Sequence, residues 1–172
     1  RDDVESRGLG DVYKRQLKKR MAYVLLDAPA GLGPGVRALL PACDHALVVT
    51  TPDDVAMRDA ERAIALTEAA GLPRPMLVVN RVRPEMVARG EMYSPQAVAS
   101  ALDVPLLGYV PEDRAVLASA ARHESFLDTE GPAKQAMERI AQRFLGEFVP
   151  MPTLERKRHW WERGSRSTGV GM

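Results

Sequence analysis

The stretch Tyr23–Gly31, with the sequence YVLLDAPAG, decides the fold class of this chain. An aromatic residue and three aliphatic ones before an aspartate predict a buried parallel strand over Tyr23–Leu26, because strands covered on both faces read as unbroken apolar runs. Parallel sheets bind ligands beyond the carboxyl ends of their strands, so this strand would deliver the Asp27 carboxylate to a ligand-binding edge. We expect Asp27 to hold Mg²⁺ through a water molecule; the alternative is that it caps the loop.

A magnesium-binding aspartate of this kind serves a nucleotide phosphate, and the residues that would hold that phosphate are absent from the sequence. The phosphate-binding loop reads G-x-x-x-x-G-K-[ST] and places its backbone amides and its lysine against the phosphates. None of the five lysines follows a glycine, and the glycine-rich run Gly31–Gly35 contains no lysine. The metal-holding half of a nucleotide site is present without its phosphate-holding half, which predicts a part of a longer protein.

Strands and helices alternate along the chain. Besides Tyr23–Leu26, apolar runs predict strands over Ala46–Thr50, Met76–Val79 and Leu106–Val110. Apolar residues at helical spacing predict helices over Asp54–Ala70, Pro95–Leu102, Ala115–Arg122 and Pro132–Leu145. The first helix should present one apolar face made of Val55, Ala60, Ala63, Ile64 and Thr67. This alternation predicts an α/β fold: a doubly wound, mostly parallel sheet with helices on both faces, its N-terminal part missing.

Composition narrows the classes of function. The 172 residues, of which 45% are hydrophobic, suffice for one globular domain, and no run of eighteen apolar residues predicts a membrane span. The single cysteine, Cys43, permits no internal disulfide and is typical of a reducing cytoplasm. The three histidines lack the spacing of metal ligands.

Positive charge is concentrated at the two ends of the chain. Residues 1–20 carry seven basic and four acidic side chains, and residues 155–172 carry five basic and two acidic ones. Since the net charge is +1, the body between them is acidic, at −5. This distribution argues against a broad nucleic-acid surface and favours one local anionic partner, such as a layer of lipid headgroups.

Five blocks of sequence, in order and at close spacing, resemble the MinD family of septum-site-determining ATPases, which belong to a deviant P-loop class. The blocks are Asp27–Gly31, Thr50–Asp53, Val55–Asp59, Asn80–Met92 and Leu106–Asp113. The last two are the most discriminating, because the first also occurs in chromosome-partitioning relatives. The resemblance covers roughly residues 17 to 163.

The resemblance implies an ATPase that uses ATP and Mg²⁺ and controls where the division septum forms. It implies a cytoplasmic protein that dimerises with ATP, binds the inner face of the cell membrane peripherally and recruits the division inhibitor MinC. Hydrolysis stimulated by MinE or an equivalent partner would release it, and no nucleic acid is involved. The chain alone is expected to be inactive without the phosphate-binding loop. The alternatives are a partitioning or flagellar-number ATPase of the same fold and a non-catalytic membrane-binding adaptor.

Candidate site residues follow the predicted strands and should meet at one edge of the sheet. They are Asp27, Thr51, Asn80 and Pro111. The resemblance implies that Asn80 hydrogen-bonds the adenine edge, that Arg81 stacks over the base, and that Pro111 and Glu112 line the other side of the pocket. Alternatively, Asn80 forms a turn, and Glu112 and Asp113 cap the next helix. Four neighbouring charges should be solvated in a loop, and the alternative is that they lie at a dimer contact: Arg83, Glu85, Arg89 and Glu91.

Residues 151–172 are predicted to form a linker and an amphipathic membrane-targeting tail. On a helix, Leu154 and Trp161 share one face, Lys157 and Arg158 flank that face, and Trp160 lies off its centre. Aromatic and cationic residues together are typical of an interfacial helix on anionic lipid. The alternative is a disordered basic tail with incidental tryptophans.

The C-terminal part of a P-loop ATPase domain is expected over residues 17–150. Residues 1–16 include the sequence DVYKRQ at Asp11–Gln16, which resembles the translation of a transposon adapter used in shotgun sequencing. We therefore expect this leader to be non-native, and the alternative is a polar, disordered arm.

Overall fold

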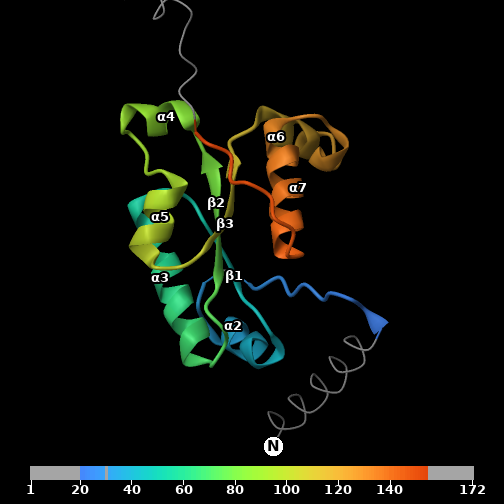
Figure 1. The fold of residues 1–172 in the computed structure, drawn as a ribbon. Helices are drawn as coiled ribbons and strands as arrows, with labels where there is room; N and C mark the ends of the chain where they lie inside the picture. The colour runs from blue at the N-terminus through green and yellow to red at the C-terminus, as the bar shows by residue number, and fades with distance from the viewer. Residues whose placement is uncertain (1–19, 30, 155–172) are drawn as a thin grey trace, which may run out of the picture.

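A three-stranded parallel sheet forms the centre of the structure (Figure 1). The structure is a computed structural model that describes residues 20–29 and 31–154. The strands stand in sequence order across the sheet and are β1 (Leu47–Thr50), β2 (Met76–Val82) and β3 (Leu106–Pro111). Three of the four predicted strands are therefore confirmed, each beginning within one residue of its predicted start.

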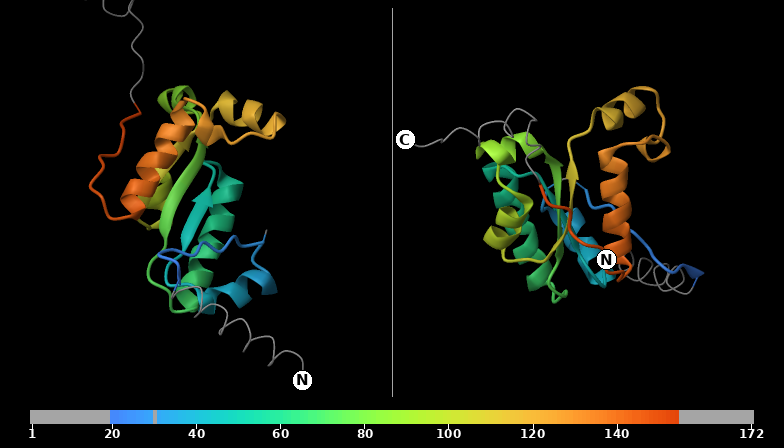
Figure 2. Two further views of the ribbon diagram at one scale, coloured as in Figure 1. Left: turned by 90° about the vertical axis from the view of Figure 1, so that its right-hand side faces the viewer. Right: turned by 45° about the horizontal axis from the view of Figure 1, so that its top comes forward.

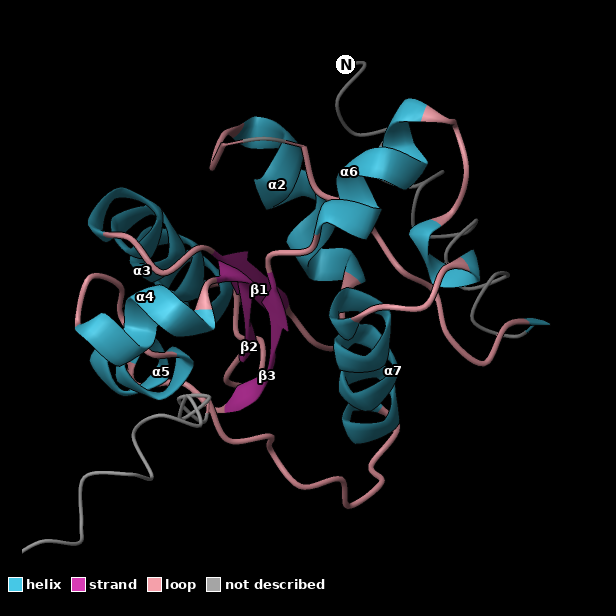
Figure 3. Ribbon diagram, turned by 90° about the horizontal axis from the view of Figure 1, so that it is seen from above, coloured by secondary structure: helices cyan, strands magenta, loops and turns pink. Residues whose placement is uncertain are grey.

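Helices cover both faces of the sheet, as the alternation of elements predicts. Helix α3 joins β1 to β2 and α5 lies between β2 and β3, and both pack on one face, while α7 follows β3 on the other (Figures 1 and 3). Because consecutive strands are neighbours, crossovers of the same hand bring α3 and α5 to the same side. The α-helices are α2 (Pro34–Leu39), α3 (Asp54–Ala69), α4 (Pro84–Arg89), α5 (Pro95–Leu102), α6 (Arg114–Ala121) and α7 (Pro132–Phe144).

Two short α-helices escape the sequence prediction. Helices α2 and α4 have six residues each and begin with a proline, which is favourable at the first helical position. Fewer than two turns give too little apolar periodicity to recognise. The charges Glu85 and Arg89 therefore lie on α4 rather than in a loop.

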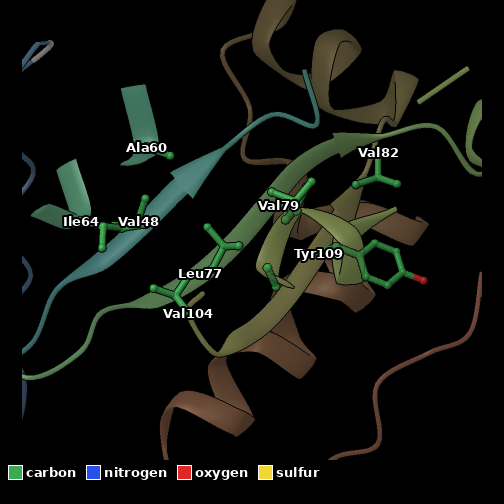
Figure 4. Close-up of a cluster of buried hydrophobic side chains, with 10 residues drawn as sticks. Val48, Ala60, Ile64, Leu77, Val79, Val82, Val104 and Tyr109 are labelled. Carbon is green, nitrogen blue, oxygen red and sulfur yellow. The ribbon is translucent and has the colours of Figure 1, made fainter. Parts of the chain in front are cut away.

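The larger apolar cluster lies between the sheet and the layer of α3 and α5 (Figure 4). In it Leu77, Val79 and Val82 of β2 are completely buried. Fully burying one such side chain contributes roughly 1.5–3 kcal/mol, so the central strand β2 is the main anchor of this layer. The predicted apolar face of α3 is buried at Ala60, Ile64 and Thr67. Val55, in the first turn of α3, is 74% exposed.

The second apolar cluster lies between the sheet and α7, and a glycine sets how closely α7 approaches. Gly108 of β3 faces this helix, and a Cβ atom there would lie 2.5 Å from Ile140 Cγ1. Leu77 pairs with Leu106 and Val78 with Gly108, so Leu107 is an extra residue in β3. This bulge re-aims the strand and lets Gly108 meet the buried side of α7.

The predicted strand Tyr23–Leu26 is wrong. This segment pairs with no strand in the described part of the chain, and its side chains are 40 to 86% exposed. It runs past the end of α7 toward α2 (Figure 2), and the rings of Tyr23 and Phe144 lie 6.0 Å apart. A buried parallel strand needs hydrogen-bonded neighbours and a helix layer on each face, and an apolar sequence does not supply them.

Candidate functional site

The candidate site is the rim of the sheet, by which we mean the C-terminal ends of the strands with residues 51, 80–83 and 111–113. Thr51 directly follows β1, and Pro111 is the last residue of β3. Asn80 was expected after β2 but lies within it, because β2 continues to Val82. The rim is at the upper end of the sheet in Figure 1, beside α4 and α6.

A bulge near the end of β2 shapes the rim. Val79 pairs with Tyr109 and Val82 with Pro111, so Asn80 and Arg81 together oppose the single residue Val110. Arg81 has a φ of 57°, a left-handed conformation that is uncommon for residues with a side chain. Its backbone N–H donates to Asn80 Oδ1 over 2.9 Å, which stabilises this conformation locally. Strained backbone of this kind is concentrated at functional sites.

Glu112 holds two arginines together at the rim. Arg81 donates from its guanidinium to Glu112 Oε1 over 3.1 Å, and Arg83 Nε donates to Glu112 Oε2. Hydrogen bonds from Arg83 and Arg81 lower the pKa of Glu112. The same pairing raises the pKa of Arg83. Arg83 was expected to be a solvated loop charge, and it is instead one of the two arginines that pair with Glu112.

Asp113 serves two helices at once. Its Oδ1 accepts from the backbone N–H of Ala115 at the start of α6, over 2.9 Å, and its Oδ2 accepts from Ala133 near the start of α7, over 3.2 Å. A Cβ atom on Gly131 would lie 2.6 Å from Asp113 Oδ2, so a glycine is needed for this approach. Of the two adjacent acids, Asp113 is therefore a helix cap and Glu112 an ion-pair partner.

Asp27 does not lie with the other candidates. It belongs to the segment near α2 and the end of α7, away from the rim (Figure 1). Without the strand Tyr23–Leu26, nothing carries the Asp27 carboxylate to the C-terminal end of the sheet. Among the described residues, no group of three or more His, Cys, Asp or Glu side chains could hold a metal ion.

The rim offers groups for a base, and the loop that would hold the phosphates is not in the sequence. Asn80 Oδ1 accepts the hydrogen bond from the backbone N–H of Arg81. The Asn80 NH₂ group is then available as a donor to a ring nitrogen. The Arg81 guanidinium is planar and 65% exposed, so it can lie against an aromatic ring. The sequence contains no phosphate-binding loop. The residues present therefore fit the base of ATP and do not fit its triphosphate or Mg²⁺.

A hollow of about 510 Å³ lies at the other end of the sheet, where β2 and β3 begin. It is lined by Arg74, Ala99, Ser100, Asp103, Val104 and Pro105. Arg74 and Asp103 form an ion pair across its surface. None of the candidate site residues lies in this hollow, so its size does not bear on nucleotide binding.

The candidate membrane residues lie mostly outside the described residues, namely Lys157, Arg158, Trp160 and Trp161. Leu154 is described, and it packs half-buried against the larger apolar cluster. In this arrangement part of the Leu154 side chain contacts the folded domain. Within the described part of the chain, no helix is long and apolar enough to cross a membrane.

Arg143 makes a half-buried set of polar contacts that sequence reasoning missed. Its guanidinium donates to three backbone carbonyls, those of Leu107, Val149 and Pro150, over 3.1, 2.7 and 2.6 Å. Burial lowers the pKa of Arg143. The missed signal was an arginine in the last turn of an amphipathic helix just before a proline-rich segment.

Comparison with known proteins defines the class. The family described as ParA, NUBPL iron-transfer P-loop NTPase, matches residues 5–145. The chain belongs to this ParA family of P-loop NTPases. A three-stranded parallel sheet between helix layers is part of the P-loop NTPase fold, as the sequence predicted.

Within that class, the chain is similar to MinD. It is 37% identical to the septum site-determining protein MinD of Synechocystis over 137 residues, which cover 78% of the chain and 52% of the relative. It is 46% identical to the putative MinD of Mesostigma viride over 136 residues, which cover 77% of the chain and 47% of the relative. The resemblance to MinD is thus confirmed, and the chain spans about half the length of these curated relatives.

Solved structures agree with the sequences. MinD of Aquifex aeolicus superposes with a TM-score of 0.76 at 33% identity, covering 83% of the chain and 61% of that protein. The MinC:MinD complex of the same organism gives a TM-score of 0.76 over 83% of the chain and 59% of the matched one. MinD of Pyrococcus horikoshii, solved with Mg-ADP, has a TM-score of 0.67 at 24% identity and supports the fold alone.

Proposed function

We propose that this chain forms the base-binding side of a MinD-type ATPase that controls the position of the division septum. The observation that carries the proposal is the β2 bulge, which sets Asn80 and Arg81 beside Glu112 at the C-terminal ends of parallel strands. Parallel α/β sheets bind their ligands at this edge. The similarity to MinD over more than three quarters of the chain adds independent support.

In this proposal, the base of ATP lies at the rim. The Asn80 amide donates to the adenine edge, Arg81 lies against the ring, and Pro111 and Glu112 border the other side. Glu112 keeps Arg81 in place before the base arrives, since the two are already paired. ATP would supply the phosphoryl group whose transfer to water drives the cycle. Asp27, if it serves Mg²⁺, must first be brought to the rim.

The proposal extends to the partners of the whole protein. A homodimer formed with ATP would bind anionic lipid through the basic tail and recruit the division inhibitor MinC. One support is the similarity of this chain to a chain of the MinC:MinD complex of Aquifex aeolicus. The other is the concentration of basic and aromatic residues after position 154. An activating partner such as MinE would release the protein from the cytoplasmic face of the membrane.

Base binding can be tested on one amide signal, because Asn80 is the only asparagine of the chain. With isotope-labelled asparagine, NMR should show a single side-chain NH₂ group, and adenosine should shift it while guanosine should not. Losing one such hydrogen bond costs about 0.5–1.5 kcal/mol, so Asn80→Ala should weaken adenosine binding roughly threefold to tenfold. Gln135→Ala, an amide loss on the exposed side of α7, is the matched control. Equal binding of both nucleosides would contradict base recognition at the rim.

Membrane binding needs a separate test. Trp160→Glu with Trp161→Glu should abolish sedimentation with anionic vesicles, because an interfacial helix needs its aromatic residues as well as its charge. Neutral vesicles should bind even the unchanged chain poorly. Unchanged binding of the double variant to anionic vesicles would leave only diffuse charge attraction.

A further inference from the structure

Residues 147–154, which we call the strap, cross from one helix layer to the other around the outer edge of β3. The strap leaves α7 through Gly146, in a left-handed conformation with a φ of 88°. It ends where Met151 and Leu154 pack against the cluster of α3 and α5. Figures 1 and 3 show this path, which begins at the lower end of α7 and ends beside α4 and the end of β2.

The strap has a sequence that can cover a sheet edge without joining the sheet. Its centre reads Val149-Pro150-Met151-Pro152. Each proline lacks an N–H group, fixes its own backbone and keeps the preceding residue extended. The strap is therefore an extended segment with few donors, and its carbonyl groups depend on side chains for hydrogen bonds.

Two side chains supply those hydrogen bonds. Arg143 donates to the carbonyls of Val149 and Pro150, and the Tyr109 hydroxyl donates to the carbonyl of Pro152 over 3.3 Å. Arg143 also donates to the carbonyl of Leu107, which lies in the β3 bulge. One guanidinium thus joins α7, β3 and the strap.

The placement of Arg143 depends on close packing of α7. A Cβ atom on Gly108 would lie 3.2 Å from Arg143 Nη1, so the bare backbone at Gly108 leaves room for the guanidinium. The described residues provide Arg143 with no carboxylate partner within ion-pair distance. Because the half-buried Arg143 guanidinium binds only backbone carbonyl groups, its role is to position the backbone and not to neutralise a carboxylate.

We propose that Arg143 is a positioning residue that locks the strap and so holds the start of the C-terminal tail at the rim. A free chain of eight residues could place Leu154 up to about 27 Å from Gly146 in any open direction. The locked strap places Leu154 in one position beside α4. The tail therefore begins on the same edge as the base-binding residues. The biological use of this position, a lipid-binding tail beside a nucleotide site, rests on the proposed function; the lock itself does not.

The lock can be tested with spin labels in the complete chain. Cys43 is replaced by serine, and labels are placed at the exposed positions Thr153 and Glu85 by Thr153→Cys and Glu85→Cys. The unchanged strap should give one narrow distance distribution by pulsed EPR. Arg143→Lys keeps the charge but gathers its donors on one nitrogen, which cannot reach the three carbonyls that Nε, Nη1 and Nη2 bind separately. The distribution should therefore broaden at least about twofold as the strap becomes a flexible linker.

Matched variants separate the lock from general loss of structure. Arg122→Lys changes an exposed arginine that pairs with Glu124, and it should leave the distribution narrow. A second label pair, Glu85→Cys with Ser100→Cys, lies within the α4–α5 layer and should stay narrow in every folded variant. A narrow Thr153–Glu85 distribution in folded Arg143→Lys would overturn the proposal.

If Arg143→Lys also broadens the second pair, the variant has lost its fold and Tyr109→Phe decides. This change removes one hydroxyl bond to the strap and keeps the buried ring, and Tyr93→Phe removes an exposed hydroxyl bond to Asp54 as its control. Broadening in Tyr109→Phe but not in Tyr93→Phe supports the lock. If Tyr109→Phe stays narrow, Arg143 still holds the strap through Val149 and Pro150, and the same labels are read in Tyr109→Phe with Arg143→Gln. A narrow distribution in that folded double variant overturns the proposal. Anionic vesicles are added only afterwards, so a chain that binds no lipid would count against the proposed function and leave the lock intact.

Discussion

The rim and the segment 20–29 carry sequence signals of similar quality, and only the rim is built into the fold. In β2, Leu77 and Val79 are completely buried between β1 and β3. In the segment 20–29, Leu25 is 86% exposed, and the segment runs away from the rim. The difference teaches that an apolar run followed by a polar site residue specifies a strand only when neighbouring strands and helix layers are present.

The sheet has an uncovered side next to β1. Val48 and Thr50 of β1 are buried under α3, while Leu47 and Val49 point to the other face and are about half exposed. Helix α7 packs against β3 and does not extend over β1 (Figure 3). Tyr23–Leu26 and this face of β1 are thus two apolar surfaces without cover among the described residues.

The largest effect predicted from this comparison is a complete absence of ATP turnover by this chain. Catalysis of phosphoryl transfer relies on lysine and backbone amides placed against the β- and γ-phosphates, and the sequence has no loop that supplies them. Phosphate release from purified chain with ATP and Mg²⁺ should equal that of a blank without protein. Release well above the blank, abolished by Asn80→Ala, would show that the rim alone assembles a catalytic site.

The second largest effect is a difference between the two regions in what a substitution costs in free energy of unfolding. Leu77→Ala should lower the free energy of unfolding by about 2–5 kcal/mol, because it removes buried methyl groups and leaves a cavity. Leu25→Ala, the same change on an exposed side chain, should stay within about 0.5 kcal/mol. Urea unfolding followed by circular dichroism measures both. A large loss from Leu25→Ala would mean that Tyr23–Leu26 is buried in solution, and the comparison would fail.

Local sequence patterns were sufficient for most elements of the fold. The start of β2 at Met76 and the whole of α5 follow directly from apolar spacing. The end of β2 did not, because Asn80 reads as a strand terminator whereas the bulge lets the strand continue to Val82. Bulges depend on the register between two strands, which a single stretch of sequence does not contain.

The site could be predicted as far as sequence neighbours and the ends of strands place its residues. Asn80 and Arg81 are adjacent, and strand ends predicted that Glu112 would lie at the same edge. The pairing of Glu112 with Arg83 joins residues far apart along the chain and has no periodic signal. Asp27 was placed at the rim by a strand that did not form.

Asp113 offers a prediction of intermediate size. Asp113→Ala removes the acceptors for backbone N–H groups at the start of two helices, so it should destabilise the fold by roughly 1–3 kcal/mol. Asp53→Ala removes the cap of α3 alone and should cost about half as much, roughly 1 kcal/mol. Thermal or urea unfolding of the two variants gives the ratio. Equal losses would mean that the contact with Ala133 contributes nothing and that α7 is held by its apolar face.

The smallest predicted effect is a pH dependence at the rim. The pKa of Glu112 is lowered from its usual value of 4.5 by the hydrogen bonds from Arg83 and Arg81. A carboxyl group with a lowered folded-state pKa contributes stability above its unfolded-state pKa and loses that contribution as the pH falls through its folded-state pKa. Wild type should therefore exceed Glu112→Gln in stability near neutral pH, and the difference should disappear as the pH falls well below 4.5.

Because the pair is exposed, the difference should be small and should shrink further in concentrated salt. An NMR titration of the Glu112 carboxyl with a midpoint at or above 4.5 would show that the arginines do not hold it in solution, and the rim would then be as loosely organised as the segment that carries Asp27.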